Sequence, residues 1–182
     1  YNLDAGTGGL SIVRNVTAAE QISGQSLYDA RRFSIGGTIY VGGSTSGSAT
    51  ANANANGTIN IGENGGTPTM NTNQFEVGRQ RVGVVNQFGG DVNVNGANNL
   101  VISQFSNSTG TYNMMGGTLD VGDPAGANGH INFNQGTGTF NQTGGDVTVN
   151  RNVQMANTNS AAVATYDISG GTLDVTGGPS DL

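Results

Sequence analysis

TYNMMGGTLDVGD, at residues 111–123, occurs in variant form twice more in the chain: as TFNQTGGDVTVN at residues 139–150 and as TYDISGGTLDVTGG at residues 165–178. In each copy, a run of alternating apolar and polar residues leads into a glycine pair, and a second alternating run follows it. Alternation with a period of two predicts β-strands that bury one face. The chain is therefore expected to consist of short strands that recur at a fixed interval.

Glycine pairs recur along the chain at intervals of 24 to 29 residues, at 8–9, 36–37, 65–66, 89–90, 116–117, 144–145 and 170–171. The second and fourth residues after a pair predict two inward columns of stacked side chains. The first column holds Ile39, Pro68, Val92, Leu119, Val147 and Leu173, and the second holds Val41, Met70, Val94, Val121, Val149 and Val175. The fourth residue before a pair predicts a third column, which holds Ile61, Val85, Tyr112, Phe140 and Tyr166.

A third strand signal lies between successive repeats, as at residues 75–77, 130–134 and 153–155. The chain should therefore form about six coils of roughly 27 residues, with three short strands in each coil. A meander of hairpins would instead place a tight Asn-Gly or Asp-Gly turn between every pair of strands. Like residues that recur one coil later favour an all-β, single-stranded parallel β-helix, or β-solenoid.

We expect one solenoid domain over residues 1–182, with regular coils at 36–178. Residues 1–35 are predicted to form an irregular first coil with a short helix or a lateral insertion, because residues 17–33 are richer in charge and helix formers than any other stretch. The Ala/Asn-rich segment 44–56 is interpreted as a strand with small residues inside, or else as a loop.

Composition excludes several classes of partner and site. The formal net charge is −6, and an anionic phosphate backbone or lipid surface would repel such a chain. Nucleic acid and membrane insertion are therefore not expected, and the apolar runs are far shorter than the roughly 20 residues that cross a bilayer. There is no cysteine to form a disulfide or a thiolate metal site. A chain that begins at Tyr1 without a leader is expected to be a mature or truncated product.

Several acidic residues are candidates for catalytic or metal-binding groups. Asp120, Asp123, Asp146 and Asp174 fall near outward or corner positions, where a pair could act on a glycosidic bond. We expect them to be solvated instead, and His130 to be a surface turn residue, so no catalytic residue and no enzyme activity are predicted. Calcium at Asp91, Asp120, Asp123 and Asp146 stays an alternative, although the nonapeptide spacing of calcium-binding solenoids is missing; no other cofactor is expected.

A threonine face is also a candidate, because a threonine follows the glycine pair in four repeats, at Thr38, Thr67, Thr118 and Thr172. Such a face would suit ice binding, but Asp91 and Asp146 interrupt the column.

The three quoted stretches resemble the glycine-rich, autotransporter-associated and PEP-CTERM-associated β-helix repeats of bacterial surface proteins, and the likeness extends from about Gly36 to Gly178. The resemblance implies that the parallel β-helix is right-handed. It also implies export across the envelope to the cell surface or beyond, and a role as stalk, adhesin or matrix component. The sequence departs from that pattern in its ragged first coil.

The two ends of the chain predict how the protein assembles. Tyr1, Asn2 and Leu3 are similar to a strand that closes a coil, whereas Thr172, Leu173, Asp174 and Val175 form a strand that opens one. Head-to-tail stacking of copies would bury both edges and build a filament. We therefore expect a structural fibre subunit whose main partner is itself.

The alternative is an adhesin or carbohydrate-binding stalk that uses its lateral asparagine ladders and Tyr40 to hold polysaccharide or a neighbouring cell. A polysaccharide lyase or hydrolase is the third candidate.

Overall fold

The computed structural model describes residues 9–11, 33–42, 56–96, 100–122, 129–156 and 161–177. These residues form strands and one short 3-10 helix, η1. The elements are β1 Gly9–Ser11, β2 Phe33–Val41, β3 Gly57–Ile61, η1 Glu63–Gly65, β4 Thr69–Val77, β5 Val82–Gln87, β6 Asp91–Val94, β7 Leu100–Ile102, β8 Thr109–Met114, β9 Thr118–Val121, β10 Ile131–Phe133, β11 Thr137–Gln142, β12 Asp146–Val149, β13 Val153–Gln154, β14 Val163–Ile168 and β15 Thr172–Val175.

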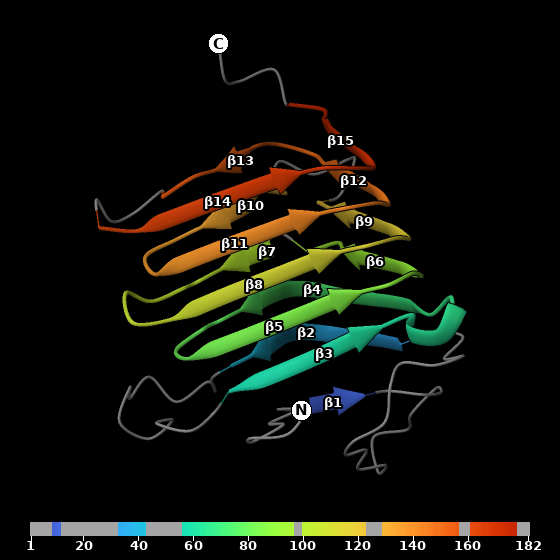
Figure 1. The fold of residues 1–182 in the computed structure, drawn as a ribbon, viewed down its shortest axis with the longest axis horizontal. Coiled ribbons are helices and arrows are strands. Elements are labelled where there is room, and N and C mark those ends of the chain that lie inside the picture. Colours follow the sequence, from blue (N-terminus) through green and yellow to red (C-terminus); the bar gives the residue numbers. More distant parts are fainter. Residues whose placement is uncertain are drawn as a thin grey trace.

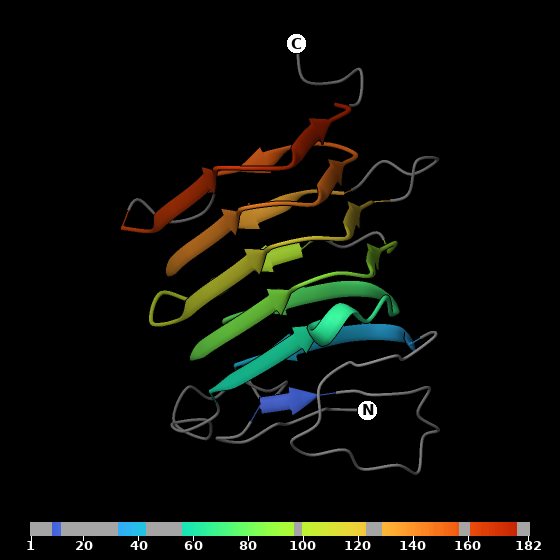
Figure 2. The ribbon, with the colours of Figure 1, turned by 45° about the vertical axis from the view of Figure 1, so that its right-hand side comes forward.

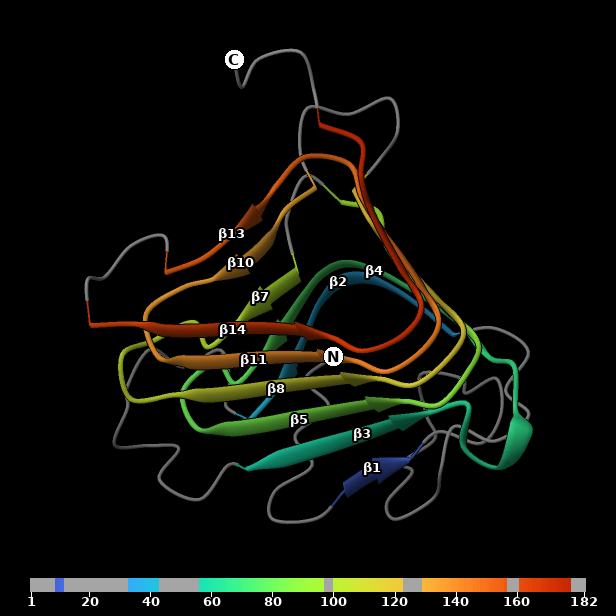
Figure 3. The same cartoon turned by 45° about the horizontal axis from the view of Figure 1, so that its top comes forward.

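The strands stack as a parallel β-solenoid with three faces (Figures 1 and 2). The first face is the sheet β1-β3-β5-β8-β11-β14. The second face joins the start of β4 to β6, β9, β12 and β15, and the third joins the end of β4 to β7, β10 and β13. Seen from its upper end, the chain winds counter-clockwise as it rises from β3 to β15, so the solenoid is right-handed (Figure 3).

The described residues complete about four coils rather than six. These coils are β3–β4, β5–β7, β8–β10 and β11–β13; β14 and β15 begin a further one. The prediction of three strands per coil is confirmed for β5–β7, β8–β10 and β11–β13. In the β3–β4 coil, one bent strand serves both the second and the third face.

Glycine pairs form the corners between the first and second faces in the later coils. Gly117 has φ +81°, and a Cβ there would lie 2.1 Å from the carbonyl oxygen of Gly90 in the coil below. A Cβ on Gly116 would lie 2.7 Å from the carbonyl oxygen of Phe88. A side chain is therefore excluded twice, once by the left-handed backbone and once by the close approach of the next coil. The pairs at 89–90, 144–145 and 170–171 are in line with this one.

The pairs at 36–37 and 65–66 are out of line, which corrects the predicted register. Ile61 lies opposite Gln87 and Thr69 lies opposite Asp91, so this corner holds seven residues where the next coil has three. The additional residues include η1 and the pair at 65–66. As a result Met70, not Pro68, lies opposite Val92, and Ile59, not Ile61, lies opposite Val85.

The pair at 36–37 is not at a corner. It lies inside β2, where the pairing with β4 is interrupted between Ile35 and Thr38. Ile39 and Val41 therefore lie opposite Phe75 and Val77 on the third face, and do not belong to the columns of the second face.

The interior is built mainly from the predicted columns. Buried positions include Ile39, Val41, Val92, Val94, Leu119, Val121, Val147, Val149, Tyr112 and Phe140. Tyr166 and Leu173 are partly buried, and Val175 is 43% exposed. Val175 departs from the prediction because β15 is the last strand of its face among the described residues, so no coil above covers its inward side.

Aromatic rings form a stack inside the first face. Phe140 lies 4.9 Å from Tyr112 and 4.5 Å from Tyr166, measured between ring centroids, and the planes are nearly parallel. These separations match the strand spacing of about 4.8 Å, so each ring stacks on its equivalent in the next coil. The irregular first coil and the small-residue strand were predicted for residues 1–35 and 44–56, which lie largely outside the described residues.

Candidate functional site

Asparagine side chains form a ladder on the outer surface of the first face. Asn60, Asn86, Asn113, Asn141 and Asp167 occupy one column on β3, β5, β8, β11 and β14. The Nδ2 atom of each of the middle three donates to the Oδ1 atom of the asparagine one coil below, at 2.9, 2.8 and 2.9 Å. The ladder ends at Asn141, because the carboxylate of Asp167 has no N–H to donate.

A groove of about 530 Å³ runs beside this ladder. Its second side is formed by the outward residue two positions after each ladder residue, just past the end of the strand and immediately before the glycine corner. These residues are Phe88, Met115, Thr143 and Ser169. The volume is in the range of ligand-binding clefts, about 300–1,000 Å³.

The groove combines amide groups with exposed apolar surface. Phe88 is 41% exposed and Met115 is 38% exposed, and they occupy adjacent coils. Such side chains are normally buried, and neighbouring apolar groups on a surface often mark a binding site. The only charged lining residue is Asp167. This arrangement can accept and donate hydrogen bonds and can pack against an apolar face.

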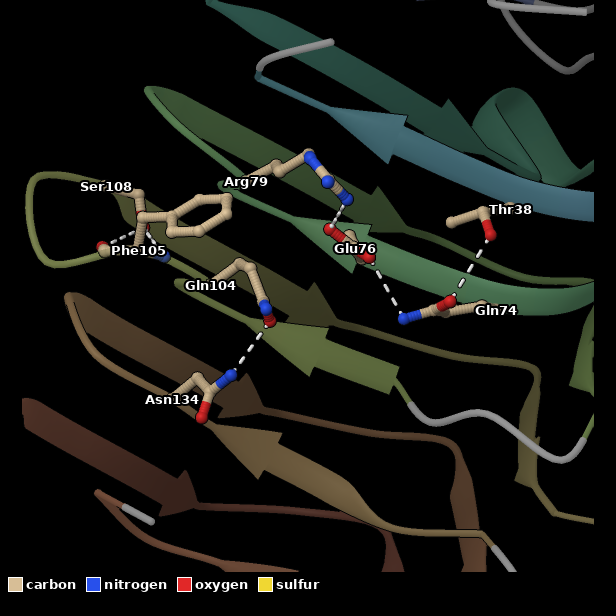
Figure 4. Close-up of polar contacts among 8 residues, drawn as sticks. All are labelled: Thr38, Gln74, Glu76, Arg79, Gln104, Phe105, Ser108 and Asn134. Carbon is tan, nitrogen blue, oxygen red and sulfur yellow. Dashed lines mark hydrogen bonds and ion pairs between the residues drawn. The ribbon is translucent and has the colours of Figure 1, made fainter. Parts of the chain in front are cut away.

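A second polar cluster lies on the third face, around Arg79 (Figure 4). Its guanidinium donates to Glu76 at 2.6 Å, and its Cζ atom lies 4.5 Å from the centre of the Tyr40 ring and 5.6 Å from that of Phe105. Gln74 donates to Glu76 at 3.0 Å and accepts from the hydroxyl of Thr38 at 3.3 Å. Tyr40, predicted as an outward aromatic contact, is therefore engaged by Arg79.

Glu76 is only 3% exposed, and burial raises the pKa of its carboxyl, while the charge and the hydrogen bond of Arg79 act in the opposite direction. The contacts of this cluster connect β2, β4 and the segment after β7. We interpret it as a brace between coils, because its polar groups are directed at each other.

The predicted acidic residues are distributed over separate columns. Asp91 and Asp146 each accept a hydrogen bond from the threonine one coil above, Thr118 at 2.9 Å and Thr172 at 2.7 Å. The column that contains them is Thr69, Asp91, Thr118, Asp146 and Thr172. Thr38 and Thr67 lie outside it, so the threonine face considered from the sequence does not form.

Asp120 and Asp174 share the neighbouring column with Thr148 between them. His130 lies just before β10 and is partly buried. The predicted assembly edge Thr172, Leu173, Asp174 and Val175 is strand β15, at the end of its face. Asp123 and the opposite edge, Tyr1, Asn2 and Leu3, lie outside the described residues.

Two interior glutamines were not predicted from the sequence. Gln87 is fully buried and accepts from the hydroxyl of Tyr112 at 2.6 Å. Its Nε2 atom donates to the carbonyl oxygens of Gly90 and Thr118, at 3.1 and 2.8 Å. Gln142 makes the equivalent contacts with Tyr166, Gly145 and Thr172. The signal is present in the repeats: a coil with Gln before the glycine pair has Asp after it, and the next coil has Tyr and Thr.

Within the described ranges, no three His, Asp or Glu side chains are grouped so that they could hold a metal ion. No helix in those ranges is long and apolar enough to cross a membrane. No protein-family model, no curated protein and no solved structure matches the chain.

Proposed function

We propose that this chain is a structural subunit of an extracellular or cell-surface fibre, in which copies stack end to end. The observation that carries the proposal is the exposed interior of the last coil that the structure describes. Ile168 and Val175 face inward but are 47% and 43% exposed, whereas Gln142 and Val149, one coil below, are fully buried. A further coil on this end would remove the apolar groups from water, which is favourable.

The backbone and the outer ladder favour the same contact. β14 and β15 each have one paired neighbour among the described strands, so a row of N–H and C=O groups at each outer edge can accept another parallel strand. In the asparagine ladder every amide donates towards the earlier coil. Asp167 carries only acceptors when ionised and is suited to receive an amide from an added coil.

A second copy of the chain is the occupant that we propose for this end. The solenoid has a different edge at its other end, where β1 and β2 lie, so the contact joins two unlike surfaces and repeats without closing. The repeats resembling those of bacterial surface proteins support a location outside the cell. The groove supports a non-catalytic role. Its lining has one carboxylate and no basic residue, whereas glycoside hydrolysis generally uses a pair of carboxyl groups.

Electron microscopy and sedimentation of the purified chain over a range of concentrations test the proposal. The wild-type chain should form filaments one solenoid wide. Ile168→Lys, which places a charge on the open interior, should leave monomers. Thr165→Lys, on the outer surface of the same strand, is the matched control and should still polymerise. Wild-type monomers at the highest concentration, or equal loss with both variants, would refute end-to-end stacking.

A further inference from the structure

We propose that the groove beside the asparagine ladder binds a linear, uncharged polysaccharide that lies along the axis of the solenoid. The groove crosses four coils, from Asn86 on β5 to Asp167 on β14. Three coil steps of about 4.8 Å give it a length of about 14 Å. An elongated cleft with the same groups repeated at each coil suits a ligand that is itself a repeating chain.

The ladder retains hydrogen-bonding capacity for such a ligand. An asparagine amide has two N–H donors and an oxygen with two lone pairs. Asn86 and Asn113 each use one donor and one lone pair within the ladder. Each keeps one donor and one acceptor, and this pairing matches sugar hydroxyls, which both donate and accept. The carboxylate of Asp167 adds a strong acceptor at one end.

Phe88 and Met115 supply the apolar part of the site. They lie one coil apart on the side of the groove next to the corner. A sugar ring has a face of C–H groups, and an exposed aromatic ring beside hydrogen-bonding side chains can pack against that face while the amides hold the hydroxyls. Removing these two side chains from water favours binding.

Charge and backbone pairing argue against other ligands. The groove contains Asp167 and no cationic side chain, in a chain of net charge −6, so an acidic polysaccharide would be repelled. A peptide usually adds to a sheet at an open edge. The groove lies on the face of a sheet in which β5, β8 and β11 are paired on both sides, so their backbone groups are not available.

The proposed site does not depend on end-to-end stacking, because its asparagines on β5, β8 and β11 and its apolar residues Phe88 and Met115 lie below the β14–β15 coil. The test uses the full chain with soluble hexasaccharides of uncharged linear glucans and mannans, and with oligogalacturonate as the acidic comparison. Binding is followed by calorimetry and by the NMR signals of the asparagine side-chain amides. We expect at least one uncharged hexasaccharide to bind and to shift the signals of Asn86, Asn113 and Asn141.

Two pairs of variants locate the site. Asn113→Ala should weaken binding about fivefold, whereas Asn93→Ala should not, although Asn93 makes the same kind of amide contact, to Asn71 at 2.9 Å, on the second face. Met115→Ala should weaken binding, and Met155→Ala should not, because Met155 is 45% exposed against 38% for Met115 but does not line the groove. Unchanged thermal transitions show that the variants are folded.

Three results would overturn the proposal. They are no binding of any uncharged hexasaccharide at millimolar concentration, tighter binding of oligogalacturonate than of every uncharged one, and binding that the groove and control variants change equally.

Discussion

Tyr112 and Phe140 lie in the same interior column, and the residue in the coil below decides which ring is suitable. In the coil below, Val85 lies opposite Tyr112, and the side-chain oxygen of Gln87, two residues further along that strand, accepts from the tyrosine hydroxyl. In the coil beneath Phe140, the equivalent residue is Met114, which offers no such acceptor. Burial raises the pKa of Tyr112, so its hydroxyl remains protonated and donates. The interior therefore tolerates polar groups only as satisfied pairs.

Tyr112→Phe should destabilise the protein by about 1–3 kcal/mol, because the side-chain oxygen of Gln87 is left buried without that donor. Adding Gln87→Met reproduces the natural pairing of Phe140 with Met114. Much of the loss should then be recovered, since removing both partners of a buried hydrogen bond costs less than removing one. Urea denaturation of the two single variants and the double variant measures the coupling. Additive losses would contradict this account of the pair.

At the scale of the element, the first strand of each coil starts against the corner that precedes it. A glycine column, Gly57, Gly83, Gly110 and Gly138, marks this contact, and the last coil has Ala164 at the same position. A Cβ on Gly110 would lie 2.2 Å from the carbonyl oxygen of Val77 and 2.7 Å from the backbone nitrogen of Ser103. These two backbone atoms are hydrogen-bonded to each other at 2.8 Å and cannot move aside without breaking that bond.

Gly110→Ala should therefore destabilise the protein by about 3 kcal/mol, the upper end of the cost of overpacking. Ala164→Gly is the matched control in the same column and should cost no more than about 1 kcal/mol, the backbone entropy of glycine. Thermal unfolding monitored by circular dichroism compares the two. Equal effects would mean that the close approach of backbone at β8 does not constrain the fold.

At the scale of the whole molecule, the coils alternate between two kinds. The β5–β7 and β11–β13 coils carry Gln87 with Asp91 and Gln142 with Asp146, and the coil above each carries the tyrosine and threonine that donate to them. At the boundary between β8 and β11, Met114 and Thr118 occupy the positions of the glutamine and the aspartate, while ring stacking and the asparagine ladder continue across it as they do elsewhere. The structural unit of this solenoid is therefore a pair of coils.

Repeating two coils should be tolerated better than repeating one. An inserted second copy of residues 82–136 preserves the alternation, so we expect a higher midpoint and a larger m-value in urea, as for added repeats in other solenoids. A second copy of residues 109–136 alone places a tyrosine coil on a methionine coil and leaves a buried hydroxyl without its glutamine. That variant should gain less stability per residue. Equal gains per residue would show that the coils are interchangeable.

The alternation within strands and the interval between glycine pairs were sufficient to predict a parallel solenoid, its three strands per coil and most of its interior. This is possible because in such a fold each side chain stacks on its own equivalent one coil later. Leu119, Val147 and Val92 could be placed in one column from spacing alone, and the structure confirms their pairing. The asparagine ladder follows from the same rule applied to the outer surface.

The tertiary structure alone decided the register around η1, the position of the pair at 36–37, and the groove itself. A corner can lengthen without changing the strand pattern on either side, so counting from Gly66 placed Pro68 where Met70 lies. The burial of Glu76 and the groove beside Phe88 likewise depend on which coil, and which corner, lies against each side chain. Spacing along the chain specifies what repeats, whereas contact between coils specifies what is covered and what remains open to a ligand.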